Sequence, residues 1–271
     1  MSIQHIYQQI ERTDPSVLEN MQDRRSAIRA FSQFAGKVAI ASLPLAIGSF
    51  FKKAYGQTTS SILDVLNYAL TLEYLEAEYY TQGVAAAGLI AAEEVSGFTQ
   101  IRDHEVAHVN FLKAAISGAG GTAVSKPNFD FTAGGSFSTV FTNYDTFLAV
   151  SQAFEDTGVR AYKGQAANLM SNKDVLTAAL NIHSVEARHA SYVRAVRRKR
   201  GASIQGWING KDTGGIPAIQ AIYNGEELTK QAEIEITNIN GFTISAGAAS
   251  AAFDEPLGTM EVLDIVRPFL K

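Results

Sequence analysis

Apolar residues recur every three or four positions in four stretches of this chain, which is the spacing of one face of an α-helix. The four stretches are Ser61 to Val84, Val95 to Ser117, Asp145 to Leu169 and Asp174 to Arg200. In the first stretch the apolar positions are Ile62, Leu66, Ala69, Leu70, Leu72 and Leu75. The pattern therefore predicts an all-α protein with four long helices.

The segments between the predicted helices carry helix-capping and helix-ending residues. Ser60 or Ser61 can cap the first helix, because a serine side chain accepts a hydrogen bond from a free backbone N–H at a helix start. Glycines end the second helix at Gly118-Ala119-Gly120-Gly121 and the fourth at Gly201. Residues 118–143 are rich in Gly, Ser, Thr and Phe, which predicts a long connection between the second and third helices.

The first 56 residues predict an export signal rather than a part of the fold. Arg24-Arg25 precedes the uncharged apolar run Val38 to Phe51, and Lys52-Lys53 follows it. A charged start and a short apolar run are typical of such signals, and the run is too short for a permanent membrane span. The segment resembles a twin-arginine signal, although Ala27 stands where Phe is commoner. This interpretation predicts a periplasmic or extracellular protein, and an amphipathic first helix is the alternative.

Composition indicates a globular protein and excludes some kinds of chemistry. Hydrophobic residues make up 46% of the 271 residues and charged residues 18%, with a net charge of −4. The absence of cysteine excludes disulfides, thiolate metal sites and cysteine nucleophiles. Beyond the N-terminus, basic residues cluster at Arg194 to Arg200, at a predicted helix end where cations meet the helix dipole and water. We therefore expect no nucleic-acid partner.

The second and fourth predicted helices carry a repeated Glu-x-x-His motif. One copy is Glu105-Val106-Ala107-His108 and the other is Glu186-Ala187-Arg188-His189. Residues three apart lie on one face of a helix, so each motif can offer an oxygen and a nitrogen ligand to one metal ion. The remaining histidines beyond the signal, His104 and His183, lie on the same two helices.

The first and third predicted helices each place a glutamate in an apolar stretch, at a matching distance from the motifs. Glu105 lies 32 positions after Glu73, and Glu186 lies 31 positions after Glu155. Such an interval puts both glutamates of a helical hairpin at the same height. Packing two such hairpins together would bring four carboxylates and two imidazoles to one place, a set that binds two divalent or trivalent ions.

A tyrosine follows each of these glutamates by seven positions, at Tyr80 and Tyr162. These tyrosines are either neighbours of the metal site or ordinary core aromatics with a satisfied hydroxyl, and the second interpretation is favoured. A single Glu-x-x-His is usually a surface pair. Two copies, each preceded by a glutamate in an apolar stretch, are harder to explain in that way, because four buried carboxylates without a cation would cost several kcal/mol each.

These motifs make residues 61–200 resemble the ferritin-like superfamily, whose four-helix bundle carries its ligands in the order Glu, Glu-x-x-His, Glu, Glu-x-x-His. The stretch from Leu70 to Tyr80 is similar to a branch with exported bacterial ferritin-like proteins and plant desiccation-related proteins. The resemblance implies a site for two ions of iron or manganese, with the second and fourth glutamates as bridges. The implied ligands are Glu73, Glu105, His108, Glu155, Glu186 and His189.

The chain departs from the superfamily pattern next to the ligands. Iron-oxidising members often have an acidic residue directly before each Glu-x-x-His, whereas this chain has His104 and Val185 there. Glu76, one turn beyond Glu73, could replace or supplement that glutamate as a ligand. These departures leave rapid iron oxidation in doubt.

Residues 201–271 predict an extension that packs on the bundle, with a short helix near Met260 to Val266 and an apolar alternation from Ile234 to Ile244. The side chains that need cover are Phe253, Leu257, Val262, Leu263 and Phe269. A small binding module is the alternative.

Three functions stay open: a redox enzyme acting on oxygen or peroxide, metal binding or storage without turnover, and a structural stress-protection protein. The sequence does not decide the oligomeric state.

Overall fold

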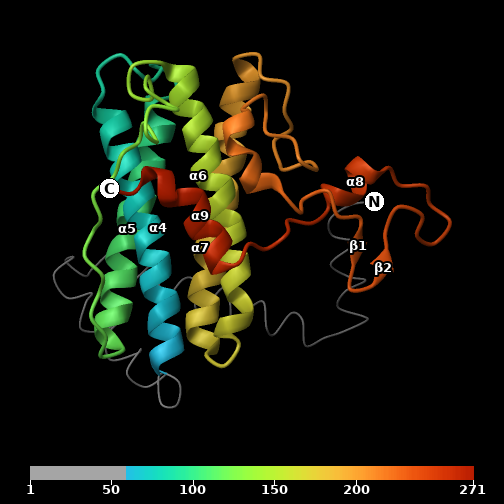
Figure 1. Cartoon of the computed structure of the whole chain (residues 1–271), viewed down its shortest axis with the longest axis horizontal. Helices are drawn as coiled ribbons and strands as arrows, with labels where there is room; N and C mark the ends of the chain where they lie inside the picture. The colour runs from blue at the N-terminus through green and yellow to red at the C-terminus, as the bar shows by residue number, and fades with distance from the viewer. Residues whose placement is uncertain (1–58) are drawn as a thin grey trace, which may run out of the picture. The chain divides into compact units, whose positions relative to one another are not determined.

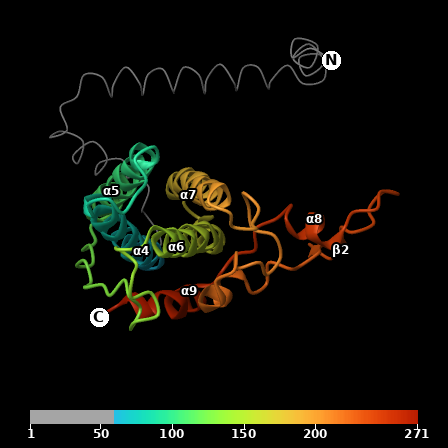
Figure 2. The same cartoon turned by 90° about the horizontal axis from the view of Figure 1, so that it is seen from above.

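Four long helices form the body of the protein (Figure 1). The structure is a computed structural model, which describes residues 59–271. They are α4 (Thr59–Ala85), α5 (Val95–Gly118), α6 (Tyr144–Gln165) and α7 (Lys173–Lys199). The views from the side and from above agree that α4 lies beside α5 and α6 beside α7 (Figures 1 and 2). The expected all-α four-helix bundle is therefore confirmed, while the expected export signal lies outside the described residues.

The helix ends agree with the sequence prediction to within a few residues, and side-chain caps account for two of the starts. The side chain of Asn143 accepts a hydrogen bond from the backbone N–H of Thr146 at the start of α6. That of Asn172 accepts from the backbone N–H groups of Asp174 and Val175 at the start of α7. Such caps satisfy N–H groups that have no partner inside the helix. The last turn of the predicted third helix forms a 3₁₀ helix, η2 (Ala166–Leu169).

Aromatic side chains fill one end of the bundle core. The ring of Tyr79 stacks on Phe147 with the centroids 5.1 Å apart, and the edge of Phe154 meets the same tyrosine at 5.0 Å. Phe98 and Phe147 are fully buried. Each such ring removes a large apolar area from water, which stabilises the fold by roughly 1.5–3 kcal/mol per side chain.

The long connection between α5 and α6 packs against the bundle. Phe131, Phe137 and Val140 from this segment are buried in the same hydrophobic core as the helices. The connection begins at Gly120, whose φ of +80° turns the chain out of the helix, a conformation that favours glycine. The crossover predicted from residues 118–143 is therefore present.

The C-terminal extension consists of short elements, one of which lies along the bundle. Helix α9 (Thr259–Val266) contacts α6, and Leu257, Val262 and Phe269 are buried in the common core. The chain end pairs with the crossover through a bridge between Phe129 and Leu270. The other elements are η3 (Pro217–Tyr223), β1 (Lys230–Gln231), β2 (Ile234–Glu235), α8 (Ala246–Ser250) and η4 (Arg267–Phe269).

Two details of the extension differ from the prediction. Phe253 is 40% exposed, so it does not receive the cover expected for it. The alternation from Ile234 to Ile244 gives only the two-residue strand β2, paired antiparallel with β1, and Ile234 is exposed. None of residues 234–244 is buried, so the alternation builds no more than this two-stranded sheet.

Buried ion pairs and hydrogen bonds join the extension to α6 and α7. Arg194 contacts Asp156 at 2.6 Å, and the Tyr223 hydroxyl of η3 donates to the same carboxylate. Arg160 contacts Glu226 at 2.7 Å. The sequence predicted that Arg194 lies in a solvated helix end, and this is wrong. The extension covers Arg194, and Asp156 matches its charge.

Within residues 59–271 no helix has both the length and the hydropathy that crossing a bilayer requires.

Candidate metal centre

Six side chains from all four helices meet in the middle of the bundle. Each long helix contributes one glutamate, and α5 and α7 each add a histidine one turn further on. The four glutamates are fully buried, and the two histidine side chains are 12% and 5% exposed. The residues are Glu73, Glu105, His108, Glu155, Glu186 and His189, the set predicted from the sequence.

The first half of the cluster is centred on His108. Its Nδ1 lies 3.1 Å from a carboxylate oxygen of Glu73 and 3.1 Å from one of Glu105. Oε1 of Glu186 lies 3.3 Å from the same nitrogen. One nitrogen and three carboxylate oxygens from three helices thus lie within 4.8 Å of one another, close enough to share one ion.

The second half of the cluster is centred on His189 and repeats this arrangement. Its Nδ1 lies 2.8 Å from an oxygen of Glu105 and 3.3 Å from one of Glu155. Oε2 of Glu186 lies 4.0 Å away. Glu105 and Glu186 take part in both groups, each with one oxygen facing each histidine. This is the geometry that a carboxylate needs to bridge two ions.

In the cluster, His108 Nδ1 has hydrogen bonds to Glu73 and Glu105, whereas several other oxygen and nitrogen atoms have none. Nδ1 of His189 and Oε1 of Glu105 are 2.8 Å apart, yet neither atom has a hydrogen bond of acceptable geometry. One oxygen of Glu155 and both oxygens of Glu186 are also buried without a hydrogen-bond partner. Buried polar atoms are almost always satisfied, because an unmet one costs about 1–3 kcal/mol. Carboxylate and imidazole donors are those that iron and manganese accept.

The pKa values of these side chains also indicate that the cluster can bind a cation. Burial raises the pKa of Glu73 to about 7 and that of Glu186 well above its usual value. Burial disfavours the imidazolium of His189, but Glu155 and Glu105 outweigh it and raise the pKa of His189 to about 11. In the absence of a cation the cluster therefore holds protons in its place, and a metal ion that binds must displace them.

The two repeated tyrosines are buried, and each donates a hydrogen bond to a glutamate of the candidate centre. The Tyr80 hydroxyl donates to Glu155, and the Tyr162 hydroxyl donates to Glu73. The favoured interpretation of these residues as ordinary core aromatics is therefore incomplete. Each hydroxyl fixes the glutamate of the opposite hairpin, and such outer partners orient metal ligands.

Glu76 lies inside the same cluster. It is 3% exposed, and burial together with the charges of Glu186 and Glu105 raises its pKa well above the usual value. The equivalent position of the second hairpin, three residues after Glu155, is Gly158. A side chain there would come within 3.3 Å of Oε1 of Glu76 and 3.2 Å of Oε2 of Glu186. The two halves of the centre therefore differ, with a carboxylate on one side and a glycine on the other.

His104 stands directly before Glu105, where iron-oxidising members of the superfamily often have an acidic residue, and it contacts the candidate ligand His189. Its Nδ1 lies 2.9 Å from Nε2 of His189, and the two rings are stacked. Nε2 is the nitrogen of His189 that points away from the carboxylates, so His104 can orient that ring. His183 belongs to neither group of four, so it does not join the centre.

The comparison with protein families agrees with this fold. The model of the ferritin-like domain matches residues 61–199, just over half of the chain. The chain therefore belongs to the ferritin-like family. A comparison with curated proteins gives no match.

Proposed function

We propose that this chain is an exported ferritin-like protein that holds two ions of iron or manganese and uses them to react with oxygen or peroxide. The observation that carries the proposal is the pair of overlapping groups of four Glu and His residues, in which buried atoms of Glu105, Glu155, Glu186 and His189 lack hydrogen bonds. Four carboxylates would balance the charge of two divalent ions, which removes the cost of burying them.

Each protein group has a distinct role in this proposal. Glu73 and His108 would bind one ion, and Glu155 and His189 the other. Glu105 and Glu186 would bridge them, because both belong to both groups. The tyrosine hydroxyls would keep the two terminal carboxylates in place.

The bound pair of ions would supply two electrons at once, one from each ion. With two protons these electrons reduce dioxygen to hydrogen peroxide, or reduce hydrogen peroxide to two molecules of water. The protein's contribution is to hold the carboxylates rigidly and to keep bulk water away from four fully buried glutamates.

The decisive experiment loads purified protein with Fe(II) or Mn(II) and follows oxidation after addition of oxygen or, separately, hydrogen peroxide. We expect oxidation faster than that of the free ions in the same buffer. Binding without accelerated oxidation would favour storage, for which the replacement of an acidic neighbour by His104 is the supporting observation. If the folded protein binds neither ion, the structural, desiccation-related role is the function that remains.

Export is tested separately. The change Arg24→Lys together with Arg25→Lys should retain the protein in the cytoplasm, because the proposed route reads the arginine pair rather than positive charge in general. Cell fractionation followed by immunoblotting measures this. A matched control is Arg29→Lys, which lies outside the pair. Normal export of the double variant would remove the twin-arginine proposal.

A further inference from the structure

The C-terminal extension carries an exposed tryptophan beside a shallow hollow. Trp207 is the only tryptophan of the chain and is 56% exposed, whereas tryptophan side chains are highly buried on average. The hollow has a volume of about 400 Å³. Its lining comes from two segments, residues 205–209 and residues 247–252, the second of which includes most of helix α8.

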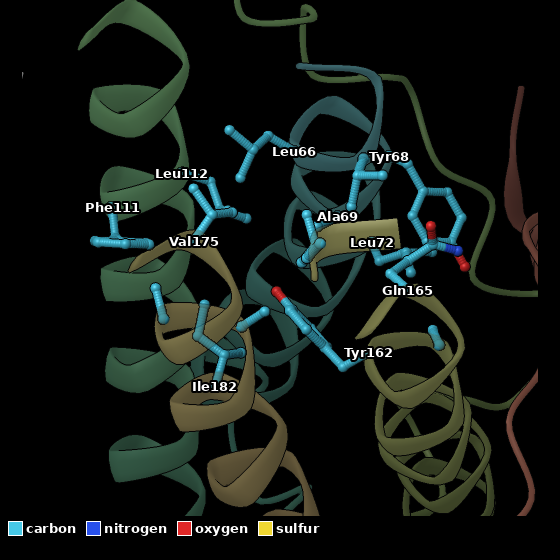
Figure 3. A pocket seen from close by; sticks show the side chains of 15 residues that line it. Leu66, Tyr68, Ala69, Leu72, Phe111, Leu112, Tyr162, Gln165, Val175 and Ile182 are labelled. Atoms are coloured by element: carbon cyan, nitrogen blue, oxygen red, sulfur yellow. The ribbon is translucent and has the colours of Figure 1, made fainter. Parts of the chain in front are cut away.

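The size of this hollow distinguishes it from the pocket inside the bundle. The inner pocket is apolar, and Leu66, Leu112 and Ile182 are among the residues that line it (Figure 3). Its volume is about 20 Å³, and one water molecule needs about 10–15 Å³, so the inner pocket belongs to the packing of the core. The hollow beside Trp207 has the size of a small-molecule site, for which about 300–1,000 Å³ is usual.

The backbone that presents Trp207 is anchored in the protein. Nη1 of the buried Arg194 donates to the carbonyl oxygen of Trp207 at 3.2 Å and to that of Gln205 at 3.5 Å. Ile204 and Ile208, on either side of the tryptophan, are both 5% exposed. The exposure of Trp207 is therefore a property of a fixed segment, because the residues around it are packed.

The lining of the hollow combines one aromatic ring with amide groups, and none of its residues is charged. The side-chain amides of Gln205 and Asn209 can each donate and accept hydrogen bonds. In the part of the chain that the structure describes, neither these amides nor the indole N–H of Trp207 has a hydrogen-bond partner. The bare backbone of Gly247 faces the amide of Asn209, since a Cβ there would lie 3.4 Å from Oδ1.

These groups match a neutral sugar ring better than they match other common ligands. A sugar ring has C–H groups on one face, which pack on an aromatic ring, and hydroxyl groups at its edge that both donate and accept hydrogen bonds. Nucleic acids and other phosphate-bearing ligands are bound through lysine and arginine, which the lining lacks. Proline-rich peptides bind in grooves lined with aromatic residues, and Trp207 is the single aromatic residue of this lining.

We propose that this hollow binds a neutral sugar ring of an oligosaccharide. One face of the ring packs on the indole of Trp207, and the amides of Gln205 and Asn209 form hydrogen bonds with its hydroxyl groups. The small side chains of Ala248 and Ala251 leave room for the ring. The proposal is independent of the metal centre, because no lining residue belongs to either group of candidate ligands.

Direct binding is measured through the fluorescence of Trp207, since no other tryptophan contributes to the emission. The full chain is titrated with the neutral hexasaccharides cellohexaose, chitohexaose, maltohexaose and mannohexaose. At least one of them should change the emission in a saturable way, because the sugar displaces water from the indole. No saturable change with any of these sugars would overturn the proposal. A change with decaproline and with none of the sugars would assign the hollow to a peptide instead.

A substitution shows whether the sugar lies on Trp207. Trp207→Ala should weaken binding of the same hexasaccharide about tenfold, because the stacked face is lost. Calorimetric titration measures this, since the variant has no tryptophan emission. Phe242→Ala is the matched control, because Phe242 is an exposed aromatic residue of the same extension and lies outside the hollow. Unchanged affinity in folded Trp207→Ala, or an equal loss in Phe242→Ala, would contradict the proposal.

A second variant keeps the tryptophan and fills the hollow. Ala248 is exposed and lines the hollow from α8, so Ala248→Leu should also weaken binding about tenfold. The emission of Trp207 still reports on binding in this variant. If Trp207→Ala does not fold, Ala248→Leu decides the question, and full affinity in the folded variant would overturn the proposal.

Discussion

Replacing His189 by alanine is expected to remove about one metal ion per chain, or to weaken both ions, and His108→Ala is expected to do the same. Each histidine is the only nitrogen donor in its group of four, and the shared Glu105 and Glu186 couple the two groups. The double replacement should cost less than the sum of the two single ones, because residues acting on one site are not additive. Elemental analysis of each folded variant gives the stoichiometry.

His183→Ala is the matched control for these variants. His183 lies on α7 with His189 but outside both groups of donor atoms. Glu76 lies outside the six-residue motif, but it is unsuitable as a control. Its carboxylate is buried close to the carboxylates of the candidate centre. Full metal content in His108→Ala and His189→Ala, together with loss in His183→Ala, would show that the ligand assignment is wrong.

Removal of the metal with a chelator is expected to lower the melting temperature by about 10 °C. A ligand that binds only the folded state and is present at about 1,000 times its dissociation constant stabilises that state by about 4 kcal/mol, and for a domain of this size each kcal/mol shifts the midpoint by about 2–4 °C. The physical cause is the buried acidic cluster, in which burial of Glu73, Glu76 and Glu186 disfavours their charged forms.

Calorimetry or circular dichroism on loaded and stripped protein measures this shift. The control is the same treatment of the His108→Ala/His189→Ala double variant, whose melting temperature should change little on stripping. Identical melting of loaded and stripped wild-type protein would count against a metal site in this bundle.

The helices and the six candidate ligands could be predicted from the sequence because both depend on local spacing. A helix repeats every 3.6 residues, so Glu105 and His108 must share a face whatever else the chain does. The near-equal intervals from Glu73 to Glu105 and from Glu155 to Glu186 then fix the height of each ligand. Neither inference requires knowledge of how the two hairpins meet.

The contacts that the sequence did not predict all depend on how separate segments meet. Tyr162 reaches Glu73 across 89 positions, and no periodicity indicates that pairing. The burial of Arg194 could not be predicted either, because arginine is normally exposed and its partner Asp156 lies on another helix. Glu76 did give a local signal, since it stands one turn beyond Glu73, but only the packing of α6 shows that Gly158 leaves room for it.

The most direct test of the central claim is the metal content of wild-type protein purified, without added metal, from the compartment in which it resides. We predict about two ions of iron or manganese per folded chain, bound tightly enough to survive gel filtration. Folded protein that contains no transition metal, and takes up neither Fe(II) nor Mn(II) when they are supplied, would contradict the account.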